Sequence, residues 1–542
     1  MKSLMKKVFA AAAAIATVFG LAATTVATAN AAGGNATLTV STTDAKFAGK
    51  TVNAYKMFSA TVSGDGKAVS YTLTDEWKPF FKDSTASGLT GNDVTDANVS
   101  DKAYDYVSGL KNNASALAAF ATKASNWAQT KANNITAGAT AKVSAAATDG
   151  KYLATFTGLD YGYYVVAVPG ATVADTKSQY ATLVSVDKAH VDFNIKGALP
   201  TVDKKVQVGS TGKDAADAKI GDTLTFTLTS TIPDMSAYST YTFNFNDTLS
   251  KGLTFRQVDS VKVGDTTLTK GTDYTVTTTP KTSGETLLTV AMNDFKKQQA
   301  NAGKKITVTY TATLNKDAVV GGAGNVNSAT IQYSNNPSTD GTGESEPSKV
   351  RVFTYGFTVD KYTGDEYTDG AARLPGAKFT LAPKNGDPMS FVKVKDGNAT
   401  ENAVYRVATD DEKTSTTITT TTTIITPASG KVDFQGLKNG EYTLTETEAP
   451  AGYNKLASAI GVKVDGQNNG TDTTHATVTI TYNNDNNGSN YNQTASNGVI
   501  PVQNKSGVIL PGTGGMGTIA FTVIGVLVIA LGVAWTLKRK NA

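Results

Sequence analysis

The chain has 542 residues, with 50 Lys and Arg against 46 Asp and Glu and a formal net charge of +4. Much of that positive charge lies in terminal segments that we expect to be removed: Lys2, Lys6, Lys7, Lys538, Arg539 and Lys540. The remainder is slightly acidic, which argues against nucleic acid as a partner. There is no cysteine, and the two histidines, His190 and His475, lie in no recognisable motif. The sequence therefore predicts no disulfide, no metal site built from cysteine or histidine, no cofactor and no enzymatic activity, and it leaves open whether the Asp- and Asn-rich loops bind an ion such as calcium.

The N-terminal segment has the pattern of an export signal. Residues 1–31 begin with basic residues, continue as an Ala-rich apolar stretch and end in the small residues Ala29-Asn30-Ala31. This pattern is typical of a secretory signal peptide that is cleaved after Ala31. The mature protein is therefore expected outside the cell.

Most of the chain alternates between polar and apolar residues with a period of two, as in Thr223–Thr229 and Thr477–Thr481. Between turn-rich stretches, this period is typical of β-sandwich modules. From about residue 94 to 131 the period becomes helical, with Leu117, Phe120, Ala124 and Trp127 on one face. We therefore expect a mainly β fold of three tandem immunoglobulin-like sandwiches, the first with added helices.

A repeated phrase marks the start of two modules. Val202-Asp203-Lys204 and Val359-Asp360-Lys361 share three residues, which suggests a repeated domain. The predicted segments are a signal peptide (1–31), an N-terminal domain with a helical insertion (32–197), a middle sandwich (198–349), a C-terminal sandwich (350–507) and a sorting segment (508–542).

Each of the last two modules has one Lys, one acid and one Asn on the apolar face of a strand. Residues i and i+2 share a face, so each polar residue is assigned through its apolar neighbours. In the middle module these are Lys204 (with Val202, Val206 and Val208), Asp247 (after Phe243 and Phe245) and Asn327 (before Ala329, Ile331 and Tyr333). In the third they are Lys361 (after Phe357 and Val359), Glu446 (after Tyr442 and Leu444) and Asn504 (after Ile500 and Val502).

A buried ion pair accounts for the Lys and the acid but leaves the Asn unexplained. An intramolecular Lys–Asn isopeptide bond accounts for all three. Burial favours the neutral amine, which attacks the Asn carbonyl, and a neutral carboxyl, which polarises it. We expect bonds Lys204–Asn327 and Lys361–Asn504, catalysed by Asp247 and Glu446, that tie the first strand of each module to its last.

Two neighbouring features refine this hypothesis. Lys205 is the alternative to Lys204, although it points to the opposite strand face. The phrase Gly158–Val168 has the same spacing as Gly436–Glu446, but Val168 stands in the place of the acid. The first module is therefore not expected to form a bond by this route.

The C-terminus combines a motif, an apolar run and a basic tail. Leu510-Pro511-Gly512-Thr513-Gly514 is followed by an uncharged run over 515–537 and by a basic tail over 538–542. The run has the length of a membrane-spanning helix, and the basic tail would remain in the cytoplasm. A plain C-terminal membrane anchor is the alternative reading of this segment.

The C-terminal pattern resembles the sorting signal of Gram-positive surface proteins, and further phrases resemble sortase-assembled pilins. The Tyr442–Tyr453 stretch is similar to the pilin "E-box", and Leu374–Leu381 to a phrase of collagen-adhesin B-type domains. Asp247–Leu253, Asn327-Ser328-Ala329 and Asn504 also match family phrases. The resemblance implies that a sortase cleaves between Thr513 and Gly514 and transfers the acyl group to an amine.

In the resembling family the accepting amine is a lysine at the end of the N-terminal domain. Lys196 occupies that position, although Asn194-Ile195 replace the family's Tyr-Pro. Lys188 is the second candidate for the acceptor. An exposed lysine between domains with no such role is the alternative.

The resemblance implies the major subunit of a fimbria anchored to the cell wall, which supports adhesion. Its expected partners are identical subunits in a head-to-tail polymer, a pilus sortase, a housekeeping sortase and peptidoglycan. Minor pilins and host surface ligands are further candidate partners. The alternative is a wall-anchored adhesin that is not polymerised and binds a host protein or glycan.

Overall fold

The computed structural model describes residues 35–542 except 65, 67, 92, 131, 132, 134, 174–178, 196, 336–339, 468–475, 484–490, 508–515 and 541–542. The predicted signal peptide (1–31), Lys196, His475 and the motif Leu510–Gly514 lie outside the described residues. The chain divides into two compact units. Unit 1 is Met1–Thr354 with Gly466–Thr477, and unit 2 is Tyr355–Asp465 with Val478–Ala542.

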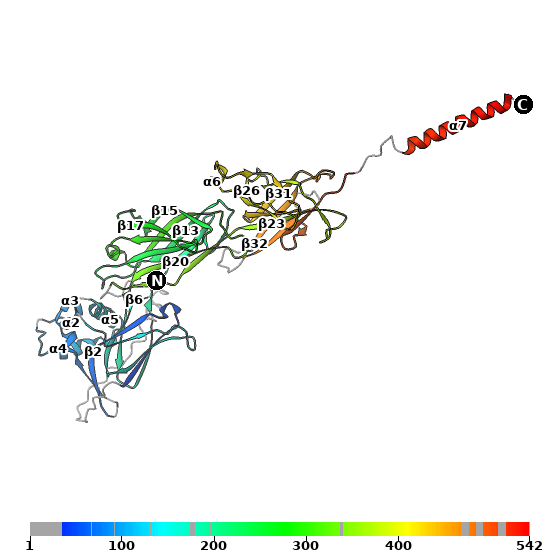
Figure 1. The fold of residues 1–542 in the computed structure, drawn as a ribbon. Coiled ribbons are helices and arrows are strands. Elements are labelled where there is room, and N and C mark those ends of the chain that lie inside the picture. Colours follow the sequence, from blue (N-terminus) through cyan, green and yellow to red (C-terminus); the bar gives the residue numbers. More distant parts are fainter. Residues whose placement is uncertain are drawn as a thin grey trace. The chain divides into compact units, whose positions relative to one another are not determined.

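The first part of unit 1 contains two sheets (Figure 1). One has the strand order β5-β1-β8, and the other has the order β3-β2-β6-β7 with β4 beside β2 and β9 beside β6. The strands are β1 (Ala36–Thr42), β2 (Thr51–Val62), β3 (Val69–Leu73), β4 (Ala139–Lys142), β5 (Tyr152–Leu159), β6 (Gly162–Val173), β7 (Gln179–Val186), β8 (His190–Asn194) and β9 (Gly197–Ala198).

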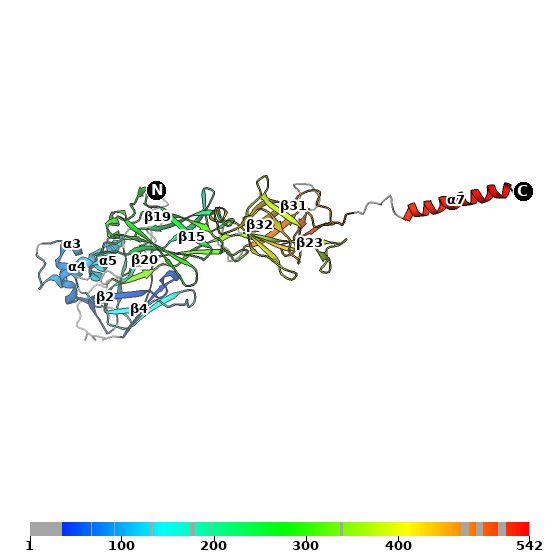
Figure 2. The same ribbon diagram turned by 45° about the horizontal axis from the view of Figure 1, so that its top comes forward.

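Helices cover the sheet that contains β2 and β6, and they lie together beside β2 in both views (Figure 1 and Figure 2). They are α2 (Lys78–Lys82), α3 (Ser84–Ser87), α4 (Val99–Gly109) and α5 (Ala114–Gln129). This part of the chain also has the 3-10 turns η1 (Ala45–Phe47), η2 (Asp75–Trp77) and η3 (Leu110–Asn112). The Asn113 side chain caps α5 by accepting from the Ala116 N–H. Phe80 and Phe120 belong to the same buried cluster as Tyr163 and Val165 of β6.

The rest of unit 1 holds a second pair of sheets, with orders β11-β10-β13-β19-β15-β16 and β12-β22-β20-β14-β18-β17, where β21 pairs with β20. The elements are β10 (Asp203–Val208), β11 (Thr211–Lys213), β12 (Ala215–Asp217), β13 (Thr223–Thr231), β14 (Phe243–Leu249), β15 (Leu253–Val263), β16 (Thr266–Thr267), β17 (Tyr274–Pro280), β18 (Thr286–Met292), η5 (Phe295–Asn301), β19 (Lys305–Leu314), β20 (Asn325–Ser334), β21 (Thr342–Glu344) and β22 (Ser348–Phe353).

Unit 2 contains the third pair of sheets, with orders β24-β23-β30-β27-β26-β28 and β29-β25-β31-β32-β33-β34. β35 pairs with β23 in parallel. The elements are β23 (Tyr355–Thr363), β24 (Ala372–Arg373), β25 (Lys378–Pro383), β26 (Phe391–Lys395), β27 (Ala403–Val407), α6 (Asp410–Lys413), β28 (Thr420–Thr421), β29 (Ile424–Ile425), β30 (Lys431–Leu437), β31 (Gly440–Glu448), β32 (Ile460–Gln467), β33 (Thr477–Tyr482), β34 (Gln493–Thr494), β35 (Val499–Gln503) and α7 (Met516–Lys540).

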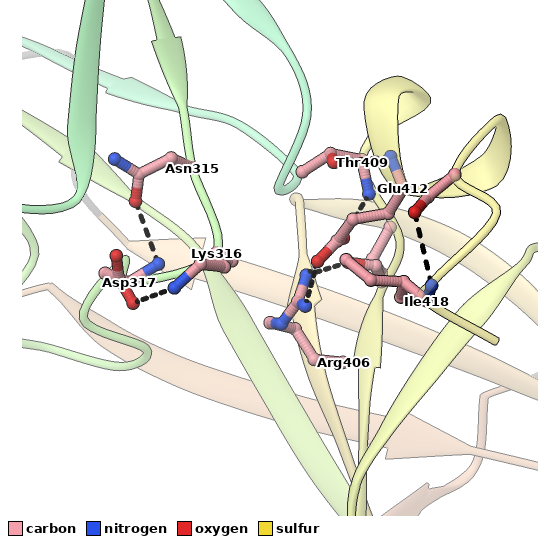
Figure 3. Close-up of polar contacts among 9 residues, drawn as sticks. Asn315, Lys316, Asp317, Arg406, Thr409, Glu412 and Ile418 are labelled. Atoms are coloured by element: carbon pink, nitrogen blue, oxygen red, sulfur yellow. Dashed lines mark hydrogen bonds and ion pairs between the residues drawn. The ribbon is translucent and has the colours of Figure 1, made fainter. Parts of the chain in front are cut away.

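A buried ion pair anchors the short helix α6 of unit 2 (Figure 3). The Arg406 guanidinium donates to both carboxylate oxygens of Glu412, at 2.9 and 2.6 Å. Glu412 also accepts from the Thr409 N–H and donates its own N–H to the Thr409 hydroxyl, which completes a capping box. This network connects β27 to the start of the Thr-rich segment that leads to β28.

The predicted fold class is confirmed: the chain is mainly β, and its sheets form three successive pairs with helices added to the first. Short helical segments occur in the other parts too, as η5 and α6. The predicted boundary at 349/350 falls inside β22. Because β22 pairs with β20 and β12, residues up to Phe353 complete the middle sheet, and the compact units divide at Thr354/Tyr355.

The predicted membrane span over 515–537 falls largely within α7. Among the described residues, no helix combines the length and the apolar character needed to cross a membrane.

Candidate cross-linking sites

The middle site joins the two facing sheets of the second pair. Lys204 lies on β10, in one sheet, whereas Asp247 on β14 and Asn327 on β20 belong to the other. β14 and β20 are neighbours, with Leu249 opposite Asn327 and Asp247 opposite Ala329. Lys204, Asp247 and Asn327 are all fully buried.

A chain of hydrogen bonds connects these side chains through Tyr310 of β19. The Lys204 ammonium group contacts Asp247 Oδ2 directly and lies 2.9 Å from the Tyr310 hydroxyl. Tyr310 donates to Asp247 Oδ2 at 2.6 Å and accepts from Asn327 Nδ2 at 2.7 Å. The amine and the amide therefore both lie within hydrogen-bond distance of one oxygen atom.

Aromatic rings remove this site from water. The Lys204 nitrogen lies 5.2 Å from the ring centre of Phe226 and 5.1 Å from that of Tyr310, whose rings stack. Burial lowers the pKa of Lys204 from its ordinary value, and the attraction of Asp247 opposes that shift. The site therefore favours release of the proton that keeps an amine from acting as a nucleophile.

Two oxygen atoms of the middle site are buried without a hydrogen-bond partner among the described residues: Asp247 Oδ1 and Asn327 Oδ1. An unsatisfied buried acceptor is costly, and the described residues supply no donor to either of these two oxygens.

The third-module site is built from β23, β31 and the residue that follows β35. Lys361 on β23 lies opposite Val502 of β35 in a parallel pair, and its ammonium group donates to the Val502 carbonyl at 3.2 Å. Asn504 is held two residues further along by its own N–H, which donates to the Tyr362 carbonyl at 3.0 Å. Lys361 is fully buried, and Asn504 is 1% exposed.

Glu446 reaches this pair from the facing sheet. Its Oε1 lies 3.4 Å from the Lys361 nitrogen, and its Oε2 accepts from Asn504 Nδ2 at 3.0 Å and from the Leu456 N–H at 2.8 Å. Asn504 Nδ2 also donates to the Asn454 carbonyl at 3.0 Å. Glu446 Oε1 and Asn504 Oδ1 have no hydrogen-bond partner in the described part of the chain, as in the middle site.

Burial lowers the pKa of Lys361 to about 8, against the opposing attraction of Glu446. A lysine with that pKa is partly neutral near physiological pH, whereas an exposed lysine is almost wholly charged. The third site therefore also favours a nucleophilic amine.

The two sites distribute the same three groups differently. In the middle site the acid and the Asn share a sheet and the Lys faces them; in the third site the Lys and the Asn share a sheet and the acid faces them. The expectation that each bond ties first strand to last is wrong for the middle module. Asn327 lies on β20, and β21 and β22 follow it in the same sheet.

Lys205 and Val208, the neighbours of Lys204 on β10, lie closer to the surface than Lys204 does. The Lys205 nitrogen pairs with Asp214 at 2.5 Å and with Asp203 at 3.3 Å, and its side chain is 34% exposed. Val208, which was expected on the apolar face with Lys204, is 46% exposed. β10 therefore turns towards solvent at its end, where β11 folds back upon it.

In the first module, Val168 is buried on β6. Over the described residues between 35 and 198, no Lys, Asp or Glu is buried. Lys188 is exposed in the turn between β7 and β8, and His190 is exposed at the start of β8. No cluster of metal-binding side chains occurs in the part of the chain that the structure describes.

Sequence reasoning missed Tyr310. The alternating pattern of β19 does indicate that Tyr310 is buried. It shares a strand face with Ile306, Val308 and Ala312, and all four are fully buried. A tyrosine on an apolar face is usually a core residue, so the strand pattern alone does not distinguish Tyr310 from its neighbours. Only the pairing of the sheets places its hydroxyl among Lys204, Asp247 and Asn327.

Comparison with known proteins supports a relation to pilins. Residues 220–337 match the family described as Gram-positive pilin backbone subunit 2, Cna-B-like domain, and residues 365–481 match a prealbumin-like fold domain. The fimbrial subunit type 2 of Actinomyces naeslundii is 25% identical over 264 residues, which cover 46% of this chain and 48% of that protein. The chain thus aligns with about half the length of this relative.

Solved structures of pilins are also similar. A backbone pilin of Streptococcus pyogenes is 16% identical, with a TM-score of 0.44 over 87% of this chain and 99% of that chain. The major pilin SpaD of Corynebacterium diphtheriae is 18% identical, with a TM-score of 0.42 over 87% and 98% of the two chains. The matches to the two domain families and to the fimbrial subunit confirm the predicted resemblance to Gram-positive pilins.

Proposed function

We propose that this chain, which contains a Gram-positive pilin backbone domain and a prealbumin-like domain, is the repeating structural subunit of a surface fimbria. The observation that carries the proposal is the match of residues 220–337 to the backbone pilin family. The middle cross-linking site lies within that domain apart from Lys204, which precedes it. A structural role also agrees with the absence of a recognisable catalytic motif from the sequence.

Two intramolecular isopeptide bonds stabilise the subunit in this proposal. The neutral amine of Lys204 or Lys361 attacks the side-chain carbonyl carbon of Asn327 or Asn504, and ammonia leaves. Asp247 or Glu446 takes the proton from the ammonium group, which produces the nucleophile and the acid together. Contact between the groups supplies the entropic part of the rate enhancement. Each reaction occurs once per molecule, so it does not make the protein an enzyme.

The burial of all six groups, their contacts and the four buried oxygens without partners support this chemistry. A simple ion pair would satisfy the Lys and the acid but would leave each Asn carbonyl oxygen buried and unpaired. The cross-link also stabilises an exported chain that has no cysteine. By analogy with a disulfide, closing a loop of on the order of 100 residues contributes about 4–5 kcal/mol.

Sortases assemble and anchor the fimbria in this proposal. Cleavage between Thr513 and Gly514 forms an acyl-enzyme, and Lys196 of the next subunit accepts the acyl group. The position of Lys196 in the sequence, after β8 and before β9 at the end of the first module, supports its role as the acceptor. A head-to-tail contact of this kind builds an open filament. The last subunit is transferred to peptidoglycan.

An immunoblot of denatured cell-wall extracts tests the polymer. Cells that make the wild-type chain should show a ladder of high-mass species, which should collapse to the monomer in Lys196→Ala but persist in Lys188→Ala. The reverse result would move the acceptor to Lys188. The absence of a ladder in wild-type cells that contain the pilus sortase would favour the singly anchored adhesin.

A further inference from the structure

Tyr310 contacts each of the other three polar groups of the middle site. Its hydroxyl donates to Asp247 Oδ2 at 2.6 Å, lies 2.9 Å from Lys204 Nζ and accepts from Asn327 Nδ2 at 2.7 Å. The hydroxyl therefore uses its one donor and both acceptor positions. It is hydrogen-bonded to both nitrogen atoms that take part in the proposed reaction.

The proposed cross-linking reaction requires a proton transfer between these two nitrogens. A neutral amine carries two protons before attack and one proton in the isopeptide bond. The amide nitrogen carries two protons before the reaction and leaves with three, as ammonia. One proton must therefore pass from Lys204 Nζ to Asn327 Nδ2 while the new bond forms and the old one breaks.

We propose that Tyr310 is a catalytic residue of the middle site and relays this proton. This inference rests on the proposed Lys204–Asn327 cross-link. The lysine nitrogen bonds to the Asn327 carbonyl carbon and gives a proton to the Tyr310 oxygen. In the tetrahedral intermediate the lone pair of Nδ2 is free, and the Tyr310 hydroxyl turns its own proton from Asp247 Oδ2 to Nδ2. The carbon–Nδ2 bond then breaks and ammonia leaves. Tyr310 ends the reaction as it began, with one proton.

The environment of Tyr310 suits this role. Burial raises its pKa well above the ordinary value for a tyrosine, and the neighbouring Asp247 raises it further, so the hydroxyl retains its proton. Its ring stacks on Phe226, with centres 5.3 Å apart and planes at 17°. The hydroxyl is thus held in position between the two nitrogens and needs no rearrangement of the backbone to exchange protons.

The third site explains why only the middle site needs a tyrosine. There, one carboxyl group contacts both reacting nitrogens: Glu446 Oε1 lies 3.4 Å from Lys361, and Oε2 accepts from Asn504 Nδ2. Glu446 can pass the proton by itself. In the middle site, by contrast, Asp247 contacts Lys204 directly and is linked to Asn327 through Tyr310.

The test measures the rate of each cross-link in the full chain. Wild type, Tyr310→Phe and the control Tyr241→Phe are synthesised in a short cell-free pulse. Tyr241 is a buried tyrosine that precedes β14 and lies outside the site. Peptide mass spectrometry then follows the Lys204–Asn327 and Lys361–Asn504 peptides with time. Loss of general acid–base catalysis should slow the middle bond of Tyr310→Phe by about 10²–10⁴-fold. The third bond, and both bonds of Tyr241→Phe, should form at the wild-type rate.

A second substitution separates proton transfer from positioning. Fluorotyrosine at position 310 keeps the ring and the hydroxyl but makes the hydroxyl more acidic, so it should change the rate of the middle bond. A wild-type rate in Tyr310→Phe would overturn the relay and leave the cross-link intact. An unchanged rate with fluorotyrosine would reduce Tyr310 to a positioning residue. If the wild-type chain yields the Lys204 and Asn327 peptides as separate, unlinked species, both the cross-link and the relay fail.

Discussion

The Lys361 ammonium nitrogen lies 3.4 Å from Glu446 Oε1 across two facing sheets, and neither side chain is exposed to solvent. An isolated ion pair in such a position contributes little net stability, because the desolvation of both charges offsets their attraction. In the proposed reaction, the pair acts by transferring a proton from the amine to the carboxylate. The predictions below separate a reactive pair from a merely structural one.

Each asparagine should control one loss of ammonia. The intact mass of the folded, processed wild-type chain should be lower than the sequence mass by two ammonia molecules. Asn327→Ala and Asn504→Ala should each lose one, and the double variant should lose none. A full sequence mass for the wild-type chain would refute both cross-links.

Replacing Glu446 should abolish the third-module bond and destabilise unit 2. Glu446→Ala removes the proton acceptor of Lys361 and leaves a buried amine without its acid. We expect one ammonia loss in place of two, and a decrease in the free energy of unfolding by at least about 4 kcal/mol. Mass spectrometry and denaturant unfolding measure these effects.

The matched control for that experiment is Glu448→Ala. Glu448 lies at the end of the same strand, and its exposed carboxylate pairs with Lys378 at 2.6 Å. Exposed pairs contribute about 0–1 kcal/mol, so this variant should retain both bonds and nearly all its stability. Loss of the cross-link in Glu448→Ala would indicate a general disturbance of β31.

Between pH 8 and 10.5, the free energy of unfolding of Asn504→Ala should depend on pH more strongly than that of the wild type. This variant keeps Lys361 as a free amine, whose pKa burial lowers from 10.5 to about 8. Between these values the unfolded chain binds a proton that the folded chain has released, so stability rises as pH increases. The rise should reach about 3 kcal/mol between pH 8 and 10.5, since one pKa unit corresponds to about 1.4 kcal/mol.

In the proposed cross-linked wild type, the Lys361 nitrogen belongs to an amide and should not titrate in that range. Thermal unfolding of both proteins across the window checks the difference, and the other titrating groups are common to both. An equal rise in wild type and Asn504→Ala would show that the wild-type lysine is still free.

The buried pair of Arg406 and Glu412 should be structural only (Figure 3). Glu412→Ala leaves the Arg406 charge buried and removes the capping box of α6, so it should destabilise unit 2 by about 3–5 kcal/mol. Both ammonia losses should remain. Lys413→Ala, which removes an exposed pair on the same helix, should cost less than about 1 kcal/mol in denaturant unfolding.

The sequence by itself determined which residues face the cores. Strand side chains alternate strictly, so the apolar neighbours of Lys204, Asp247 and Asn327, and of Lys361, Glu446 and Asn504, were enough to place all six inside. Alternation failed at Val208, because a strand end can turn towards solvent without any change in its pattern.

The tertiary structure alone decided which of these groups meet, and through which atoms. Strand order and the facing of two sheets depend on long-range pairing, which a local period of two does not encode. For this reason the sequence did not show that Tyr310 connects Asp247 to Asn327, that Glu446 contacts both nitrogens of its site, or that β22 completes the sheet of the middle module. The residue types were visible in the sequence, whereas the route of the proton depends on the packing of one sheet against the other.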